Sequence, residues 1–404
     1  MGNFPSILAG WRVSEHVWWK DNLPTINEFK LKASWAQMGN DLVEPFQYLS
    51  SYNFGKGILL GSNAIYSQAL YQSGAPNPNI TWEVGKMYNF GLESYLFNYA
   101  LSLELDFFYE ERSNILIRRN ASVPNFTGLN LPDENFGIVN NKGVEMMLGY
   151  KGRASDFTYN FNAGFTFTRN KVVEFDEPVR NVPWQISTGK PQGSHLLYKY
   201  DGIFRDAAHV ESLPSVPGAR PGDIIIRDVD NDGDVDPNDR VLLPFTEDPE
   251  ITFNLNSSVT YKSIAVTFLF QGVENAVRNV YTDTRQGTAG NYFRYDVIDR
   301  WNPQNIDASK PRAFDKVEEY WRASYLTDYG FHKLGYARLK NVQVAYTIPE
   351  KVTKLLSLEQ AQVFISGQNI FLVYNKNKIF DPEVSNTQTY PLMRTFSIGG
   401  NLIF

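Results

Sequence analysis

The chain has 404 residues, of which 15% are aromatic, a formal net charge of −6 and a sequence pI of about 5.4. Nucleic-acid-binding domains carry basic faces, so this acidic balance argues against a nucleic acid as a partner. The mean hydropathy is −0.34, and no apolar run approaches the roughly 18 residues that a membrane-spanning helix needs, which excludes a helical membrane protein.

Apolar and polar residues alternate with a period of two, in segments that include several longer than the strands of about five or six residues usual in soluble proteins. From Leu101 to Glu110, Leu, Phe and Tyr alternate with Ser, Glu and Asp, and Phe108 alone breaks the pattern. Membrane strands have about 9–11 residues, with an apolar face toward lipid and a polar face toward the lumen. The alternating segments, in chain order, are 4–13, 101–110, 144–151, 157–168, 264–270 and 395–404. They predict an all-β chain that forms a transmembrane antiparallel β-barrel.

Two kinds of connection alternate between the predicted strands. Short turns are expected near 97–100, 152–156 and 261–263. Long segments rich in Gly, Pro, Asn and Asp are expected at about 39–81, 116–135, 175–249, 272–330 and 375–392. Outer-membrane barrels have short periplasmic turns and long extracellular loops, so we expect the long segments at the cell surface. No shift in composition divides the chain, and residues 1–404 are expected to form part of one barrel.

The last ten residues, Thr395 to Phe404, alternate without a break and end on an aromatic residue. A barrel leaves no unpaired strand edge in lipid, and this segment suits a final barrel strand. We read about eleven strands in all, whereas single-chain bacterial barrels have an even number. No charged segment followed by an apolar core follows Met1, as a signal peptide requires. The sequence is therefore expected to be the C-terminal fragment of a longer barrel protein, without a plug domain.

An acidic segment at 228–239 carries the most specific local chemistry. Its six carboxylates belong to Asp228, Asp230, Asp232, Asp234, Asp236 and Asp239. With Gly233 at the sixth position, the spacing matches a calcium-binding loop, except that Asp239 stands where that loop has a bidentate glutamate and Asp234 would offer its backbone carbonyl. Oxygen ligands in an irregular loop favour Ca²⁺ over Mg²⁺. We predict a structural Ca²⁺ site, with a solvated acidic turn as the alternative.

Other candidate site residues are less specific. The histidines at 16, 195, 209 and 332 lie far apart without the spacing of a zinc site, and no motif locates a Ser-His-acid set, so no catalytic residue is expected. Trp184, Trp301 and Trp321 lie in long segments, where an aromatic face could stack on a sugar ring. The alternative for each is a membrane-interface or loop-core tryptophan.

Several segments resemble a known family in the order expected for it. They are FPSILAGWRVS (4–14), LKASWAQMGN (31–40), NNKGVE (140–145), GDIIIRDVDNDG (222–233), LKNV (339–342) and ISGQN (365–369). These segments resemble the TonB-linked, or TonB-dependent, receptors of the SusC/RagA type, and the resemblance covers essentially the whole chain. In that family a barrel of about 22 strands surrounds an N-terminal plug, so this chain would supply the C-terminal half of the wall.

The resemblance implies import across the outer membrane of a Bacteroidetes-like Gram-negative bacterium. The implied cargo is a glycan oligosaccharide or, less often, a peptide, and the implied partners are a SusD-like surface lipoprotein and, through the missing N-terminal part, the TonB-ExbB-ExbD complex. The wall would contact outer-membrane lipid. The terminal strand resembles the signal that the insertion machinery of the family reads, which here would comprise Phe396, Ile398, Leu402 and Phe404.

Two other classes of protein stay open at this point. A secreted calcium-dependent β-sandwich that binds sugar or acts as an adhesin would have shorter strands, with turns every 8–12 residues or so. An outer-membrane barrel hydrolase would need a catalytic triad, which no motif locates.

Overall fold

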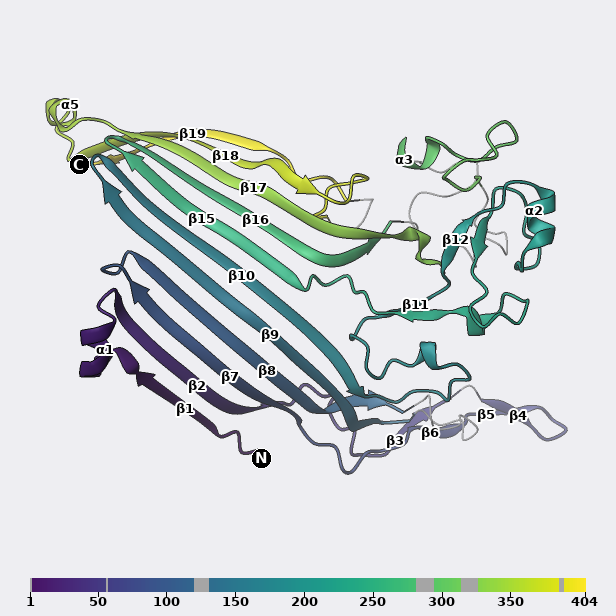
Figure 1. Cartoon of the computed structure of the whole chain (residues 1–404). Coiled ribbons are helices and arrows are strands. Elements are labelled where there is room, and N and C mark those ends of the chain that lie inside the picture. Colours follow the sequence, from purple (N-terminus) through teal and green to yellow (C-terminus); the bar gives the residue numbers. More distant parts are fainter. Residues whose placement is uncertain (1, 56, 120–130, 281–293, 314–325, 385–388) are drawn as a thin grey trace.

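One sheet dominates the computed structural model, which describes residues 2–55, 57–119, 131–280, 294–313, 326–384 and 389–404. Eleven strands pair antiparallel, each with its neighbours in chain order among these strands (Figure 1). They are β1 (Ser6–Arg12), β2 (Ile26–Asn40), β7 (Glu83–Leu96), β8 (Leu101–Arg118), β9 (Asp133–Ala154), β10 (Phe157–Glu174), β15 (Ile251–Tyr261), β16 (Ile264–Asn279), β17 (Phe331–Thr347), β18 (Gln360–Asn375) and β19 (Thr395–Ile403). Within the described residues, β1 and β19 form the two edges.

The period-2 pattern gives the sheet one apolar and one polar face. On β10, Phe165 pairs with Met146 of β9 and with Phe253 of β15, whereas the next residue, Thr166, pairs with Glu145 and Thr252. Because directly paired residues of neighbouring strands point to the same side, these rows continue each face across the sheet. Aromatic rings stack along the apolar face, and the centroids of Phe157 and Tyr261 lie 4.4 Å apart.

The two ends of the strands differ. At one end, here called the turn end, tight turns join β7 to β8, β9 to β10 and β15 to β16 (Figure 1). The first of these turns is made by Phe97, Asn98 and Tyr99, which all have positive φ, at the position that the sequence predicts. The opposite, loop end carries the long connections (Figure 1). The chain enters β1 from the loop end and leaves β19 at the turn end, as expected for an odd number of strands running alternately.

Short elements occupy the connections. Four small strands lie between β2 and β7: β3 (Ser51–Phe54), β4 (Ile58–Leu60), β5 (Ile65–Ser67) and β6 (Leu70–Gly74). Between β10 and β15 lie β11 (His195–Leu197), β12 (Tyr200–Ile203), β13 (Ile224–Ile226), β14 (Val241–Leu243) and α2 (Ala207–Ser212), together with the 3-10 turns η3 (Pro183–Gln185) and η4 (Pro237–Asp239). The remaining short elements are η1 (Val13–Glu15), α1 (Val17–Asn22), α3 (Arg294–Val297), η5 (Asp328–Gly330) and α5 (Glu350–Leu355).

The boundaries of some connections differ from the expected ones. The segment expected to start at Gly272 starts later, because β16 continues to Asn279. The segment expected at 116–135 is shorter, since β8 reaches Arg118 and β9 begins at Asp133. In both places glycine or charged residues continue the ladder, because backbone pairing with a neighbouring strand outweighs weak local β-propensity.

This architecture confirms the all-β antiparallel fold and the count of eleven strands. A β-sandwich is the wrong alternative, because its strands are short and lie in two packed sheets, whereas β9 alone has 22 residues within a single sheet. Among the described residues, no helix has the length and apolar character needed to cross a bilayer.

Candidate functional site

The polar face of the sheet carries charged side chains held in a network near the turn end. Lys32 of β2 places its Nζ 3.0 Å from Glu93 Oε1 of β7, and 2.9 Å from Glu104 Oε1 and 3.4 Å from Asp106 Oδ2 of β8. Lys30 also contacts Glu93, at 3.1 Å. These charges come from three adjacent strands and would be costly on a face exposed to lipid. They mark the polar face as the one that lines the water-filled side of the wall.

Glycines make room for side chains on this polar face. A Cβ at Gly91 would lie 2.2 Å from Asp106 Oδ1, so only glycine leaves space for the Lys32–Asp106 contact. Gly143 makes room for the ring of Phe108 in the same way, since a Cβ at position 143 would lie 2.6 Å from that ring. Phe108, the residue that breaks the alternation of its strand, is therefore accommodated on the polar face over a glycine.

A second, buried network anchors the connection between β18 and β19 to the polar face. Arg338 of β17 is only 3% exposed, and its guanidinium lies 2.7 Å from Asp381 Oδ2 and 2.8 Å from Glu383 Oε1. Lys340 pairs with the same Glu383. No motif in the sequence predicts this network. Arg338 and Lys340 are two residues apart, as are Asp381 and Glu383, and this matching spacing is the one hint of the network in the sequence. No local pattern indicates that the basic pair contacts the acidic pair.

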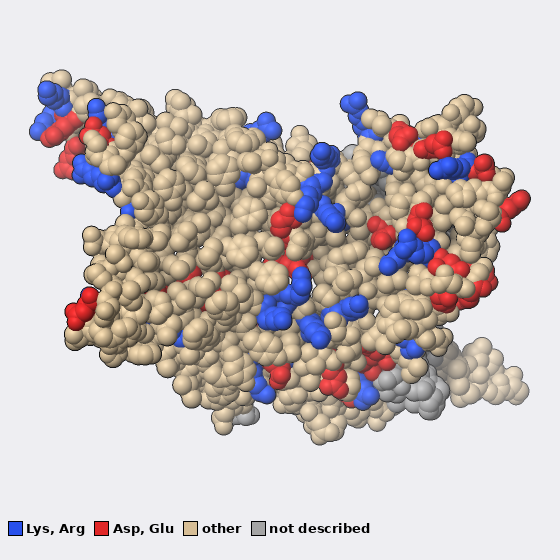
Figure 2. Space-filling view, in the orientation of Figure 1, with Lys and Arg blue, Asp and Glu red and all other residues tan. Residues whose placement is uncertain are grey.

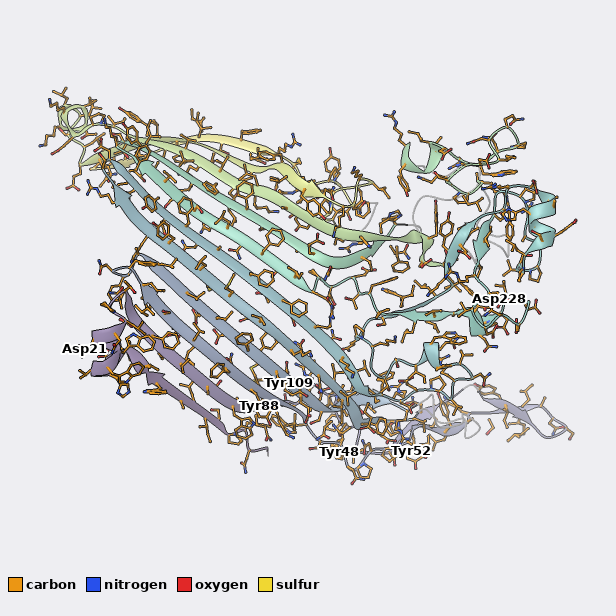
Figure 3. All side chains as sticks on the ribbon, viewed as in Figure 1. Asp21, Tyr48, Tyr52, Tyr88, Tyr109 and Asp228 are labelled. Carbon is orange, nitrogen blue, oxygen red and sulfur yellow. The ribbon has the colours of Figure 1, made fainter. Side chains whose placement is uncertain are left out.

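The connection between β10 and β15 folds into a unit with its own small core, which we call the outer-loop module (residues 175–250). Strand β11 pairs with β14, and β12 pairs with β13. Phe204 and Ile224 are each 1% exposed, and Tyr200, Val216 and Ala219 of the module pack against Ile224 together with Tyr329, which precedes β17. This core holds the acidic segment in a defined conformation at the loop end of the sheet, where Asp228 lies (Figure 3).

Three of the six predicted carboxylates converge. Oxygens of Asp228, Asp230 and Asp232 all lie within 4.8 Å of one another, an arrangement that could bind a metal ion. The turn is shaped by Asp228, whose carboxylate accepts hydrogen bonds from the backbone N–H groups of Asn231, at 2.7 Å, and Gly233, at 3.0 Å. Gly233 adopts φ of +93°, a conformation that favours glycine.

The other three aspartates are placed differently. Asp239 is fully buried, and its carboxylate accepts hydrogen bonds from the N–H groups of Val229 and Asp236. Asp236 caps η4 by accepting from the N–H of Asn238. Asp234 is exposed. The carboxylates of Asp236 and Asp239 therefore close the loop through the backbone, while those of Asp228, Asp230 and Asp232 face one another.

Electrostatic strain concentrates on Asp230. Its Oδ1 is buried and has no hydrogen-bond partner within the described part of the chain. The pKa of this carboxyl is raised, first by burial and then by the charges of Asp232, Asp239 and Asp228. A bound cation would offset this repulsion and satisfy the unpaired oxygen, so the residues present fit a hard divalent ion.

Two tryptophans of the long connections, Trp184 and Trp301, hold loops together. Trp184 donates its indole N–H to the carbonyl of Asn238, at 2.8 Å, beside the acidic loop. Trp301 donates to the carbonyl of Arg205, at 3.0 Å, and its ring covers Gly222, where a Cβ would lie 2.4 Å from it. Trp321 lies outside the described residues. Ligand contact through the ring faces of Trp184 and Trp301 stays a prediction.

The terminal strand β19 pairs with β18 and places Phe396 opposite Gly367 and Ile398 opposite Ile365. The four proposed signal residues, Phe396, Ile398, Leu402 and Phe404, are between 58% and 84% exposed. Exposed apolar side chains on an edge strand suit contact with lipid or with another strand. Their role as an insertion signal stays a prediction.

Comparisons with known proteins place the chain in a family. The family described as TonB dependent receptor-like, beta-barrel matches residues 3–370. TonB-dependent receptor P26 of Formosa agariphila is 27% identical over 438 residues, and TonB-dependent receptor SusC of Bacteroides thetaiotaomicron is 22% identical over 428 residues. These alignments include 99% and 100% of this chain but only 42% and 40% of the relatives, so the chain spans less than half of their length.

The fold agrees with solved structures. The RagAB peptide transporter superposes with a TM-score of 0.76 at 19% identity, covering 99% of this chain and 43% of the transporter chain. The RagAB peptide importer in its open-open state gives 0.78 at 18% identity. Proteins of this kind lie in the outer membrane of Gram-negative bacteria and transport rather than catalyse, in agreement with the location and the non-enzymatic role expected from the sequence. This chain belongs to the family of TonB-dependent receptor β-barrels, and it is similar to SusC and RagA over nearly all its residues.

Proposed function

We propose that the protein containing this chain imports a nutrient across the outer membrane in a TonB-dependent manner. The chain contributes eleven strands of the wall, with the polar face toward the transport path and the loop end at the cell surface. The observation that carries the proposal is the contrast between the two faces, since the ionic network around Lys32 suits an aqueous lumen and the opposite face suits lipid.

The proposed cargo is a glycan oligosaccharide, with a peptide as the second candidate. The resemblance to SusC/RagA-type receptors supports the first, and the similarity to a peptide transporter supports the second. The proposed partners are a SusD-like surface lipoprotein at the loop end and the TonB-ExbB-ExbD complex, reached through a part of the protein outside this chain.

Exposed aromatic residues at the loop end support a protein partner there. In the connection between β2 and β7, Phe46, Tyr52 and Phe54 are 68%, 61% and 71% exposed. Tyr48 and Tyr52 lie where this connection leaves the sheet (Figure 3). Aromatic side chains are enriched in protein interfaces and are costly to leave in water, so a lipoprotein or another part of the receptor is expected to cover them.

Import is tested by deleting the gene from its native bacterium. Growth on oligosaccharides or on peptides as the sole carbon source should fail, and uptake of the labelled cargo should stop. A plasmid copy should restore both, and a plasmid copy in a strain lacking TonB should not. Probing outer-membrane fractions with antibody against residues 175–249 should reveal a band whose mobility shifts on boiling. Unchanged growth and uptake on both classes of nutrient would overturn the proposal.

We further propose that Asp228, Asp230 and Asp232 hold a structural Ca²⁺ ion that stiffens the outer-loop module. Millimolar Ca²⁺ should protect this segment from protease in whole cells, and a chelator should remove the protection. Asp230→Asn should weaken Ca²⁺ binding by about tenfold or more, because affinity follows the number of charged ligands.

The matched control is Asp248→Asn, which changes an aspartate of the same connection outside the cluster. It should bind Ca²⁺ as the wild type does. Equal protease protection with and without chelator in the wild type would leave the solvated acidic turn as the correct interpretation.

A further inference from the structure

A basic cavity lies at the loop end of the sheet. It has a volume of about 800 Å³ and is lined by six basic side chains and two carboxylates. The basic residues are Lys142, Arg169, Lys171, Lys190, Lys333 and Lys376, and the acidic ones are Glu250 and Glu274. In a chain whose net charge is −6, this is a local excess of positive charge. Figure 2 shows Lys and Arg gathered near the centre of the view, with some Asp and Glu beside them, between the largely uncharged surface of the sheet and the loops.

The register places this cavity on the apolar face rather than in the lumen. A directly paired row crosses β7, β8, β9 and β10 through Tyr88, Tyr109, Lys142 and Arg169. The Arg169 guanidinium lies over the ring of Phe167, on the same side of the strand. Since paired residues share a face, Lys142 and Arg169 point to the side that the Phe and Leu residues occupy.

The chemistry of this face changes sharply along the strands. The row two residues nearer the turn end is wholly apolar and consists of Phe90, Phe107, Val144 and Phe167. Two residues further, about 7 Å along a strand, the row contains two tyrosines and two basic residues. Tyr88 and Tyr109 lie side by side on β7 and β8, Tyr88 toward the loop end of β7 and Tyr109 at the middle of the longer β8 (Figure 3). Tyrosines beside basic residues mark the level where hydrocarbon gives way to headgroups.

The cavity exists because β15 is short. It begins at Ile251, whereas β10 runs to Glu174 and β16 to Asn279. Two segments of the outer-loop module fill the place of its missing end by backbone pairing. The N–H of Val172 donates to the carbonyl of Lys190, at 2.9 Å, and the N–H of Val277 donates to that of Thr246, also at 2.9 Å. The hollow is thus framed by hydrogen-bonded backbone.

Much of the positive charge has no counter-charge within the described residues. Arg169 donates two hydrogen bonds of 2.6 Å to Glu250, and Lys376 lies 2.7 Å from Glu274. No ion pair in the described part of the chain neutralises Lys142, Lys171, Lys190 or Lys333. Four ammonium groups around one hollow repel one another and favour an anionic ligand.

We propose that this cavity binds the phosphorylated headgroup of an anionic membrane lipid, whose acyl chains lie along the apolar face below it. Phosphate accepts hydrogen bonds from several Lys and Arg side chains at once, which a single carboxylate cannot match. The cavity adjoins the lipid-facing surface, and this continuity favours a lipid over free phosphate. With the loop end at the cell surface, an orientation that rests on the proposed function, this lipid belongs to the outer leaflet.

The test uses the protein purified from outer membranes and native mass spectrometry with dioleoyl phosphatidic acid as the probe. Dioleoyl phosphatidylcholine, with the same acyl chains, and inorganic phosphate are the comparison ligands. The variant carries Lys142→Gln, Lys190→Gln and Lys333→Gln. Its matched control carries Lys20→Gln, Lys351→Gln and Lys354→Gln, which remove three lysines from α1 and α5 at the turn end.

The wild type and the control should retain phosphatidic acid in preference to phosphatidylcholine. The cavity variant should bind phosphatidic acid about tenfold or more weakly, as expected when several basic groups leave an anionic headgroup. Both variants should keep the heat-dependent gel shift and import the nutrient, so a failure of this inference is distinguishable from a failure of the import proposal. Equal lipid retention by the cavity variant and the control, equal binding of the two lipids, or displacement of the lipid by millimolar phosphate would overturn it.

Discussion

Replacing Phe165 with arginine should prevent stable assembly of the barrel in the outer membrane. Phe165 lies near the middle of β10 on the apolar face, paired with Met146 and Phe253. A guanidinium on the lipid-facing side near the bilayer midplane costs about 2–4 kcal/mol. We expect a much smaller amount of folded protein in outer-membrane fractions and a lower temperature for the loss of the fast-migrating form on gels.

The adjacent substitution, Thr166→Arg, is the matched control. It adds the same side chain to the same strand but on the polar face, opposite Glu145. An arginine there meets a carboxylate and an aqueous lumen, so the level and the melting temperature of the folded protein should stay close to those of the wild type. If the two variants assemble equally well, the assignment of the two faces is wrong.

Replacing Arg338 with methionine should strongly destabilise the loop end of the wall. The arginine is 3% exposed and compensates both Asp381 and Glu383. Removing one partner of a buried ionic network leaves uncompensated charge and costs about 3–5 kcal/mol. The connection between β18 and β19 should detach from the polar face and become sensitive to protease, and the thermal midpoint of the protein should fall.

Lys354→Met provides the comparison for this variant. Lys354 pairs with Glu350 on α5, where both side chains are largely exposed, and such surface pairs contribute little to stability. Its protease pattern and thermal midpoint should match those of the wild type. A second variant, with Arg338→Met, Lys340→Met, Asp381→Leu and Glu383→Leu, removes the network as a whole. It should recover part of the stability, since the variant then buries no uncompensated charge.

The strands and their faces follow from sequence because the signal is local. In an extended strand, successive side chains point to opposite faces, so the alternation from Phe157 to Thr168 assigns each residue to a face. Strand β10 has this arrangement in the structure. Tight turns are local as well, and the turn expected at 97–100 forms with three consecutive residues at positive φ.

The tertiary structure decided which residues meet. Of the six candidate aspartates, Asp228, Asp230 and Asp232 converge, whereas Asp236 and Asp239 bind backbone N–H groups of the same loop. Phe108 faces the lumen because Gly143 of the next strand leaves space for its ring. Arg338 of β17 meets Asp381 and Glu383 only because the connection between β18 and β19 folds back onto the sheet, and Lys142 lies beside Arg169 because β9 and β10 pair in that register.

What the sequence by itself determined is therefore the period-2 strand pattern, the separation of apolar and polar faces and the alternation of short and long connections. Each of these depends on neighbouring residues and on the pleat of a single strand. The buried network, the convergence of three carboxylates and the basic cavity depend on strand register and on where β15 begins. The register and the start of β15 are set by backbone pairing between segments of the folded chain, and no local pattern of residues encodes that pairing.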